Sequence, residues 1–95
     1  MRNPAEEGML AAREENRQRE QKIRNTAATT DMRRARKAGV LAITDTKRGV
    51  VEVSYEVGYK LYAISEFQGG KIIAKGRAGE ILPVLAALYT VDGLQ

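Results

Sequence analysis

An alternation of apolar and polar residues constrains the fold of this chain more than any other feature. Apolar side chains occupy every odd position from Val51 to Ala63, and most even positions between them are polar, as at Glu52 and Lys60. This period of two is the pattern of an extended strand with one buried face. The run is long for one strand, and Gly58 marks a bend, bulge or turn within it. The alternation therefore predicts β-structure whose odd positions face the core.

A second apolar segment precedes this run. Residues 40–44 (VLAIT) indicate a strand that is joined to the run by a short polar turn. The register of this first hairpin stays open. One pairing places Val40 and Ala42 on the core face, and a shift by one residue places Leu41 and Ile43 there instead.

A second hairpin follows, and Gly69-Gly70 predicts a two-residue turn of type I′ for it. The register from this turn divides the side chains between two faces of the sheet. The predicted core face holds Ala63, Phe67, Ile72 and Ala74, and the outer face holds Lys60, Tyr62, Ile64, Lys71, Ile73, Lys75 and Arg77. A slip of one residue would exchange the two faces, but the odd-position alternation agrees with this assignment.

The last predicted element is a helix over residues 80–90. Pro83 lies in its first turn, where a missing N–H does no harm, and Gly93 ends the segment. The helix is apolar nearly all round, so one side should pack on the sheet while the other needs cover. A second subunit would supply that cover, which predicts a homo-oligomer formed through this helix.

The first part of the chain is charged and predicted to be helical. Residues 5–24 are good helix formers with polar side chains on nearly all sides. Asn25-Thr26 weakens this helix, and a short basic helix starts near Thr29 or Thr30 and stops at Gly39. We therefore expect two helices before the sheet.

These elements together predict an α+β fold. Its parts are a polar N-terminal helix, a short basic helix, a three- to four-stranded antiparallel meander and an apolar C-terminal helix. Because the apolar residues are concentrated after Gly39, we divide the chain into a charged helical extension, residues 1–37, and a folded domain, residues 38–95.

The net charge of +4 is confined to residues 24–37. This segment carries Arg24, Arg33, Arg34, Arg36 and Lys37 against the single acid Asp31, whereas acids and bases balance on either side of it. A compact cationic block usually attracts a polyanion, most often nucleic acid. The alternatives are a solvated linker or basic residues that complement a helix C-terminus.

The outer face of the second hairpin adds a candidate surface, where Lys60, Lys75 and Arg77 surround Tyr62. Cations follow a phosphate backbone and an aromatic ring stacks on a base, which suits single strands. Alternatively, Tyr62 and Ile64 pack under the N-terminal helix or, with Ile73, form a protein interface. The full predicted nucleic-acid site is Arg24, Arg33, Arg34, Arg36, Lys37, Lys47, Arg48, Lys60, Tyr62, Lys75 and Arg77.

The composition argues against several classes of protein. The 95 residues include no cysteine and no histidine, so a disulfide framework, a thiolate metal site and the commonest general base are all absent. We expect no catalytic activity, no metal and no cofactor. No apolar run is long enough to span a bilayer, which predicts a cytoplasmic protein of a bacterium or an infected host cell.

The order of strands followed by an apolar helix resembles the single-stranded-DNA-binding domain of the positive-cofactor-four transcriptional coactivators. The likeness covers the basic block at 33–37, the strands within 40–77 and the helix at 80–90. It implies single-stranded DNA binding, a basic N-terminal extension and dimers formed through the terminal helix. We therefore predict a single-stranded DNA- or RNA-binding protein. The alternative is a small bacteriophage-type accessory protein that binds and modulates a host protein.

Overall fold

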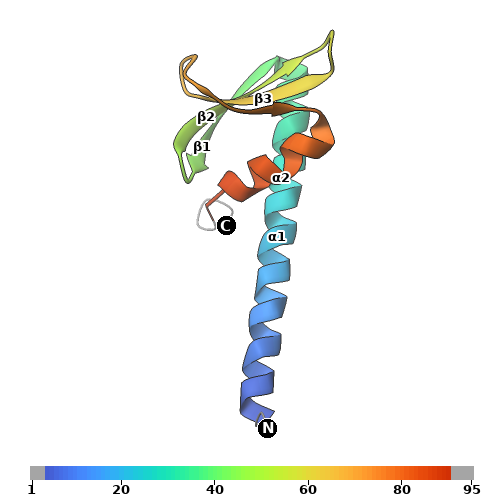
Figure 1. Ribbon diagram of the computed structural model, residues 1–95, viewed down its shortest axis with the longest axis vertical. Coiled ribbons are helices and arrows are strands. Elements are labelled where there is room, and N and C mark those ends of the chain that lie inside the picture. The colour runs from blue at the N-terminus through green and yellow to red at the C-terminus, as the bar shows by residue number, and fades with distance from the viewer. Residues whose placement is uncertain (1–3, 91–95) are drawn as a thin grey trace.

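The computed structural model describes residues 4–90, with side chains from residue 17 onward. A long helix projects from a small sheet, and a short helix crosses it (Figure 1). The elements in order are α1 (Pro4–Ala38), β1 (Val40–Thr46), β2 (Gly49–Glu56), β3 (Leu61–Glu66), β4 (Ile72–Gly76) and α2 (Ala78–Leu88). The four strands form one antiparallel sheet in the order β1-β2-β3-β4, so the predicted α+β class and meander are confirmed.

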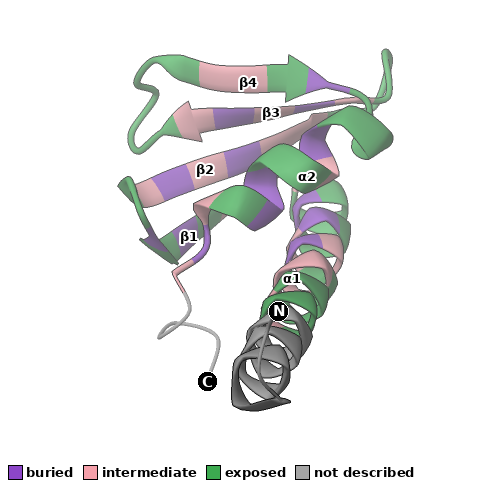
Figure 2. Ribbon diagram, turned by 60° about the horizontal axis from the view of Figure 1, so that its bottom comes forward, coloured by how far each residue is buried: buried purple, intermediate pink, exposed green. Residues whose placement is uncertain are grey.

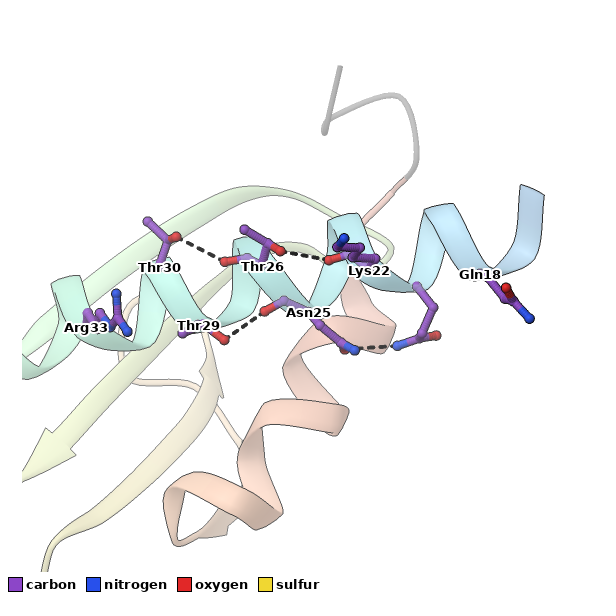
Figure 3. A pocket seen from close by; sticks show the side chains of 8 residues that line it. Gln18, Lys22, Asn25, Thr26, Thr29, Thr30 and Arg33 are labelled. Atoms are coloured by element: carbon purple, nitrogen blue, oxygen red, sulfur yellow. Dashed lines mark hydrogen bonds between the residues drawn. The ribbon is translucent and has the colours of Figure 1, made fainter. Parts of the chain in front are cut away.

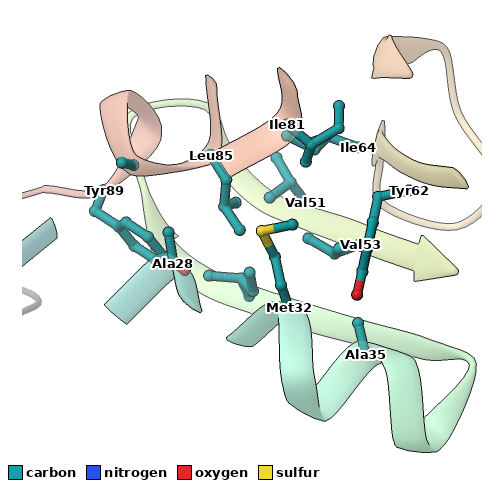
Figure 4. Packing of buried hydrophobic residues seen from close by; sticks show 12 residues of the cluster. Ala28, Met32, Ala35, Val51, Val53, Tyr62, Ile64, Ile81, Leu85 and Tyr89 are labelled. Carbon is teal, nitrogen blue, oxygen red and sulfur yellow. The ribbon is translucent and has the colours of Figure 1, made fainter. Parts of the chain in front are cut away.

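Both helices lie on the same face of the sheet (Figure 2). The hydrophobic core lies between the sheet and the two helices (Figure 4). Its members are Ala28, Met32, Ala35, Ile43, Val51, Val53, Tyr62, Ile64, Ile81, Leu85, Ala86 and Tyr89. The core therefore includes the last third of α1 and does not begin at the sheet.

The two helices expected before the sheet are one continuous helix of 35 residues, so the predicted break at Asn25-Thr26 is wrong. The threonine hydroxyls find hydrogen-bond acceptors within this helix. Thr26 and Thr29 donate to the backbone carbonyls of Lys22 and Asn25 at 2.9 and 2.8 Å. The buried stripe of Ala28, Met32 and Ala35 adds the packing that keeps the segment helical.

The predicted stop at Gly39 agrees with the structure. The helix ends at Ala38, and Gly39 has a φ of 88°, which glycine adopts without strain. The N–H of Gly39 donates to the carbonyl of Ala35 at 2.7 Å and so satisfies one of the last carbonyls of α1.

The strand pairing between β2 and β3 reverses the predicted faces of β3. Tyr55 pairs with Tyr62 and Val53 with Ile64, so odd positions of β2 lie opposite even positions of β3. Val51 and Val53 are buried as predicted, but Tyr62 and Ile64, predicted to lie outside, are only 6% and 0% exposed. The alternation therefore predicts the core face of β2 correctly and that of β3 wrongly.

The second hairpin also differs from the prediction. Glu66 and Lys71 close a loop of four residues rather than two, and the Glu52 carboxylate accepts hydrogen bonds from the N–H groups of Gln68 and Gly69. Gln68 and Gly69 both have positive φ angles, of 62° and 73°. This loop shifts the register.

That shift exchanges side chains between the faces of β4. Ser65 pairs with Ile72 and Ile64 with Ala74, with an irregularity between them. Phe67 and Ile72, predicted to be core residues, are 50% and 58% exposed. Ala74 packs against the core as predicted, and Ile73, predicted to lie outside, packs there too. The predicted faces of this hairpin are therefore mostly wrong.

The first hairpin adopts the second of its two possible registers. Leu41 pairs with Val53 and Ile43 with Val51, which places Leu41 and Ile43 against the core. A bulge before Thr46 lets the end of β1 meet the chain after α2, where Thr46 forms a bridge with Tyr89.

The apolar C-terminal helix begins two residues earlier than expected and ends at Leu88. Ile81, Leu85 and Ala86 are buried, and Leu82 and Leu88 pack partly against the same core. Helix α1 packs against α2 and supplies part of the cover that the sequence assigned to a second subunit. None of the helices within residues 4–90 is long and apolar enough to cross a membrane.

Candidate nucleic-acid interface

A pocket of about 480 Å³ lies where the end of α1 meets the sheet and the start of α2. Its lining residues are Arg36, Tyr55, Tyr59, Lys60, Tyr62, Arg77 and Ala78, which we name the tyrosine–arginine pocket. The residues come from four places in the chain: the last turn of α1, the paired ends of β2 and β3, the loop between these strands, and the N-terminus of α2. The fold thus joins segments that are distant in sequence.

Sheet pairing fixes two of the tyrosines. Tyr55 and Tyr62 lie opposite each other on β2 and β3, and their ring centroids are 4.7 Å apart at an interplanar angle of 45°. Tyr62 also lies beside Ala35 in the core (Figure 4). This pair forms a rigid aromatic wall, because both rings are held by neighbouring strands.

The third tyrosine is placed differently. Tyr59 lies in the loop between β2 and β3 and is 73% exposed. Its neighbour Lys60 has a φ of 55°, in the left-handed region, and this turns the chain back into β3. Tyr59 is therefore the aromatic ring of the pocket that a ligand can contact most freely.

The charge of the pocket is positive. Arg36, Lys60 and Arg77 line it, and no aspartate or glutamate belongs to its lining. The guanidinium carbon of Arg36 lies 5.5 Å from the ring centroid of Tyr55, a cation–π contact that holds the arginine at the rim. Three cations without a lining carboxylate attract an anionic ligand.

Two carboxylates that are close in sequence to lining residues, Glu56 and Glu80, have other partners. Glu80 accepts a hydrogen bond from the backbone N–H of Arg77 at 3.2 Å and caps α2. Glu56 lies 3.9 Å from the ammonium group of Lys75, and both side chains are about half exposed. Lys75 is therefore partly neutralised, which weakens it as a phosphate contact.

The structure brings some of the predicted site residues together and separates others. Arg36, Lys60, Tyr62 and Arg77 all line the tyrosine–arginine pocket. Tyr62 forms part of its buried wall rather than an exposed stacking platform. The sequence prediction missed Tyr55 and Tyr59, although three of the four tyrosines of the chain lie within residues 55–62, a signal that was available.

The remaining predicted residues lie away from the pocket. Lys47 and Arg48 are in the turn before β2, at the opposite end of that strand from the pocket. Arg33 and Lys37 are exposed on α1, and Arg24 is half-buried with an Nε atom that has no hydrogen-bond partner. Arg34 lines a different cavity.

Arg34 lines a second cavity, of about 330 Å³, between α1 and β1. Asp31 and Asp45 also line it, together with Tyr89. The hydroxyl of Tyr89 donates a hydrogen bond of 2.5 Å to the Asp31 carboxylate. Burial, the hydrogen bond to Asp31 and the charge of Asp31 raise the pKa of Tyr89 well above its ordinary value. This cavity holds both signs of charge and is a poorer anion site.

No group of three or more acidic, cysteine or histidine side chains within residues 17–90 is arranged to hold a metal ion. Comparison of the chain with known protein families, with curated proteins and with solved structures found no match.

Proposed function

We propose that this protein binds single-stranded nucleic acid and that the tyrosine–arginine pocket receives one nucleotide. The observation that carries the proposal is the convergence of Arg36, Lys60 and Arg77 around three tyrosines in a pocket without a lining carboxylate. The volume of about 480 Å³ is within the range of small-molecule sites and suits a nucleotide.

Each group of the pocket has a role in this proposal. The exposed ring of Tyr59 stacks on a base, and the three cations contact the flanking phosphates. A base within a duplex is already stacked between its neighbours, so the base of an unpaired strand is the one that is free to stack on Tyr59, and an unpaired strand is the preferred ligand. Stacking of one base contributes about 1–3 kcal/mol.

The alternative is an accessory protein that binds a host protein, for which the predicted contact included an exposed patch of Tyr62, Ile64 and Ile73. Ile64 and Tyr62 are buried, so no exposed patch of Tyr62, Ile64 and Ile73 exists. The projecting part of α1 is the remaining candidate contact for a protein. Association of two copies through α2 also stays a prediction, with Val84 its one large hydrophobic residue exposed by more than a third.

The test is fluorescence anisotropy with labelled single-stranded and duplex DNA and RNA of equal length at two salt concentrations. We expect Tyr59→Ala to weaken single-strand binding about tenfold, which corresponds to about 1.4 kcal/mol. Phe67→Ala is the matched control, because Phe67 is a half-exposed aromatic residue in the loop at the other end of β3. The control should bind like the wild type.

A second pair of variants tests the charge. Lys60→Gln should weaken binding and reduce its salt dependence, whereas Lys71→Gln, which removes the same charge from the loop after β3, should have little effect. Equal losses in both variants of either pair would overturn the proposed site. No binding at low salt would overturn the proposed function and favour a protein partner.

A further inference from the structure

An open trough of about 510 Å³ runs along the surface of α1 (Figure 3). It is lined by side chains of this helix alone. They are Gln18, Gln21, Lys22, Asn25, Thr26, Thr29, Thr30 and Arg33. All are exposed or half-exposed, and no acidic residue is among them. We name this surface the α1 trough.

The α1 trough ends one helical turn before the tyrosine–arginine pocket. Arg33 lines the trough, and Arg36 lines the pocket one turn later. Gln18 and Arg36 are separated by about five turns of 3.6 residues, so they lie on the same line along the helix. The α1 trough and Arg36 of the pocket therefore lie on the same side of the helix.

The charge of α1 is unevenly distributed around this line. Within residues 17–38, the acids are Glu20 and Asp31, and the helical rotation of about 100° per residue places both on the side away from Gln18 and Arg36. Asp31 is held on that side by its hydrogen bond from Tyr89. The trough side carries Lys22 and Arg33 without a neighbouring acid in its lining.

Hydrogen-bonding groups complete the chemistry of the α1 trough. Thr26, Thr29 and Thr30 each donate their hydroxyl hydrogen to a carbonyl four residues earlier, so their oxygens keep lone pairs that can accept hydrogen bonds. The amide oxygen of Asn25 accepts from Gln21 at 3.0 Å, which leaves its NH₂ group as a donor. Donors, acceptors and cations are thus all present in the trough lining.

We propose that the α1 trough is an extension of the tyrosine–arginine pocket, along which the sugar–phosphate chain of a bound single strand runs toward the N-terminus of α1. This inference rests on the proposed function. From Gln18 to Arg36 the helix rises about 27 Å, which spans about eight nucleotides at the spacing of about 3.4 Å in a stacked strand. A polyanionic strand suits this surface because its lining carries positive charge without acids and lies on the same side of α1 as Arg36 of the pocket.

The length of the ligand separates the two surfaces. We expect a 12-nucleotide strand to bind at least tenfold more tightly than a 4-nucleotide strand of the same composition. Lys22→Glu should leave the 4-nucleotide affinity unchanged, weaken the 12-nucleotide strand at least threefold and lower its logarithmic salt slope by about 0.7. Parallel DNA and RNA strands show whether the threonine acceptors favour the 2′-hydroxyl.

Arg17→Glu is the matched control, because it makes the same change of charge on an exposed residue outside the trough lining of the same helix. Circular dichroism of both variants checks that the helix is kept. Equal weakening by the two variants, or a 12-nucleotide affinity no greater than that of the 4-nucleotide strand, would overturn the role of the trough and leave the pocket intact. Loss of all binding in Tyr59→Ala, with Lys22→Glu unaffected on long strands, would also confine the site to the pocket.

Discussion

Two isoleucines on neighbouring strands provide a matched test of which sheet face is the core. Ile64 on β3 is 0% exposed, and Ile72 on β4 is 58% exposed. Replacing either by alanine removes the same three carbon atoms, so the chemistry of the change is held constant. A difference in stability between the two variants therefore reports their environments.

The expected magnitudes follow from burial. Three buried carbons at about 0.8 kcal/mol each give about 2.4 kcal/mol for Ile64→Ala, and the cavity left behind raises the cost toward 5 kcal/mol, within the range of about 2–5 for such changes. Ile72 has about two-fifths of its surface buried and leaves a site that water fills, so Ile72→Ala should cost about 1 kcal/mol.

Urea unfolding followed by circular dichroism measures both changes. With a slope of about 1 kcal/mol per molar for a small domain, the midpoint should fall by at least about 2 M for Ile64→Ala and by about 1 M for Ile72→Ala. If Ile64→Ala does not fold, Ile64→Val should still cost about 0.5–1.5 kcal/mol while Ile72→Val is nearly neutral. A cost at Ile72 equal to or larger than that at Ile64 would refute the register of β3 and β4.

Two further predictions concern α1 and its contacts. Ala35 is fully buried where α1 meets the sheet, so Ala35→Leu should destabilise the fold by about 1–3 kcal/mol through overpacking, whereas Ala38→Leu, at an exposed position, should change the melting temperature little. The pKa of Tyr89 is raised in the folded chain, so the unfolded chain loses the tyrosine proton at a lower pH than the folded chain does. The contribution of protonated Tyr89 to the free energy of unfolding is therefore complete below about pH 10 and is lost as the pH rises above that value. At neutral pH, Tyr89→Phe should cost about 1–2 kcal/mol because the hydrogen bond to Asp31 is lost. The variant should also lose less stability than the wild type between pH 9 and pH 11. An equal fall of the urea midpoint in the two proteins over this pH range would contradict the prediction.

The sequence was sufficient for the kinds of element but not for all of their boundaries. The alternation in residues 51–63 and the apolar residues of 80–90 predicted a sheet and α2 correctly, because the spacing of apolar residues shows which face of an element is buried. The continuous α1 was missed because Asn25-Thr26 has weak helix propensity. The stripe of Ala28, Met32 and Ala35 was the opposing signal, since small residues at helical spacing allow close packing.

The faces of β3 could not be decided from the pattern. Residues 61–64 are apolar at odd and even positions alike, so alternation alone fits either face. The loop between β2 and β3 sets the pairing, and its shape depends on a left-handed conformation at Lys60 that no residue type signals. The candidate pocket was only partly predicted. Tyr55 and Arg36 lie far apart in the sequence and meet only through the packing of α1 on β2.

The location of a bound strand tests the central claim most directly. A single strand carrying a photoreactive halogenated uracil is crosslinked to the protein, and the modified tryptic peptides are mapped by mass spectrometry. Because Tyr55 and Tyr59 share the tryptic peptide of residues 49–60, we predict that the main crosslink lies in this peptide and that Tyr59→Ala strongly reduces its yield. A main crosslink in a peptide without pocket residues, such as that of residues 38–47 in β1 and the turn after it, would contradict the proposed site.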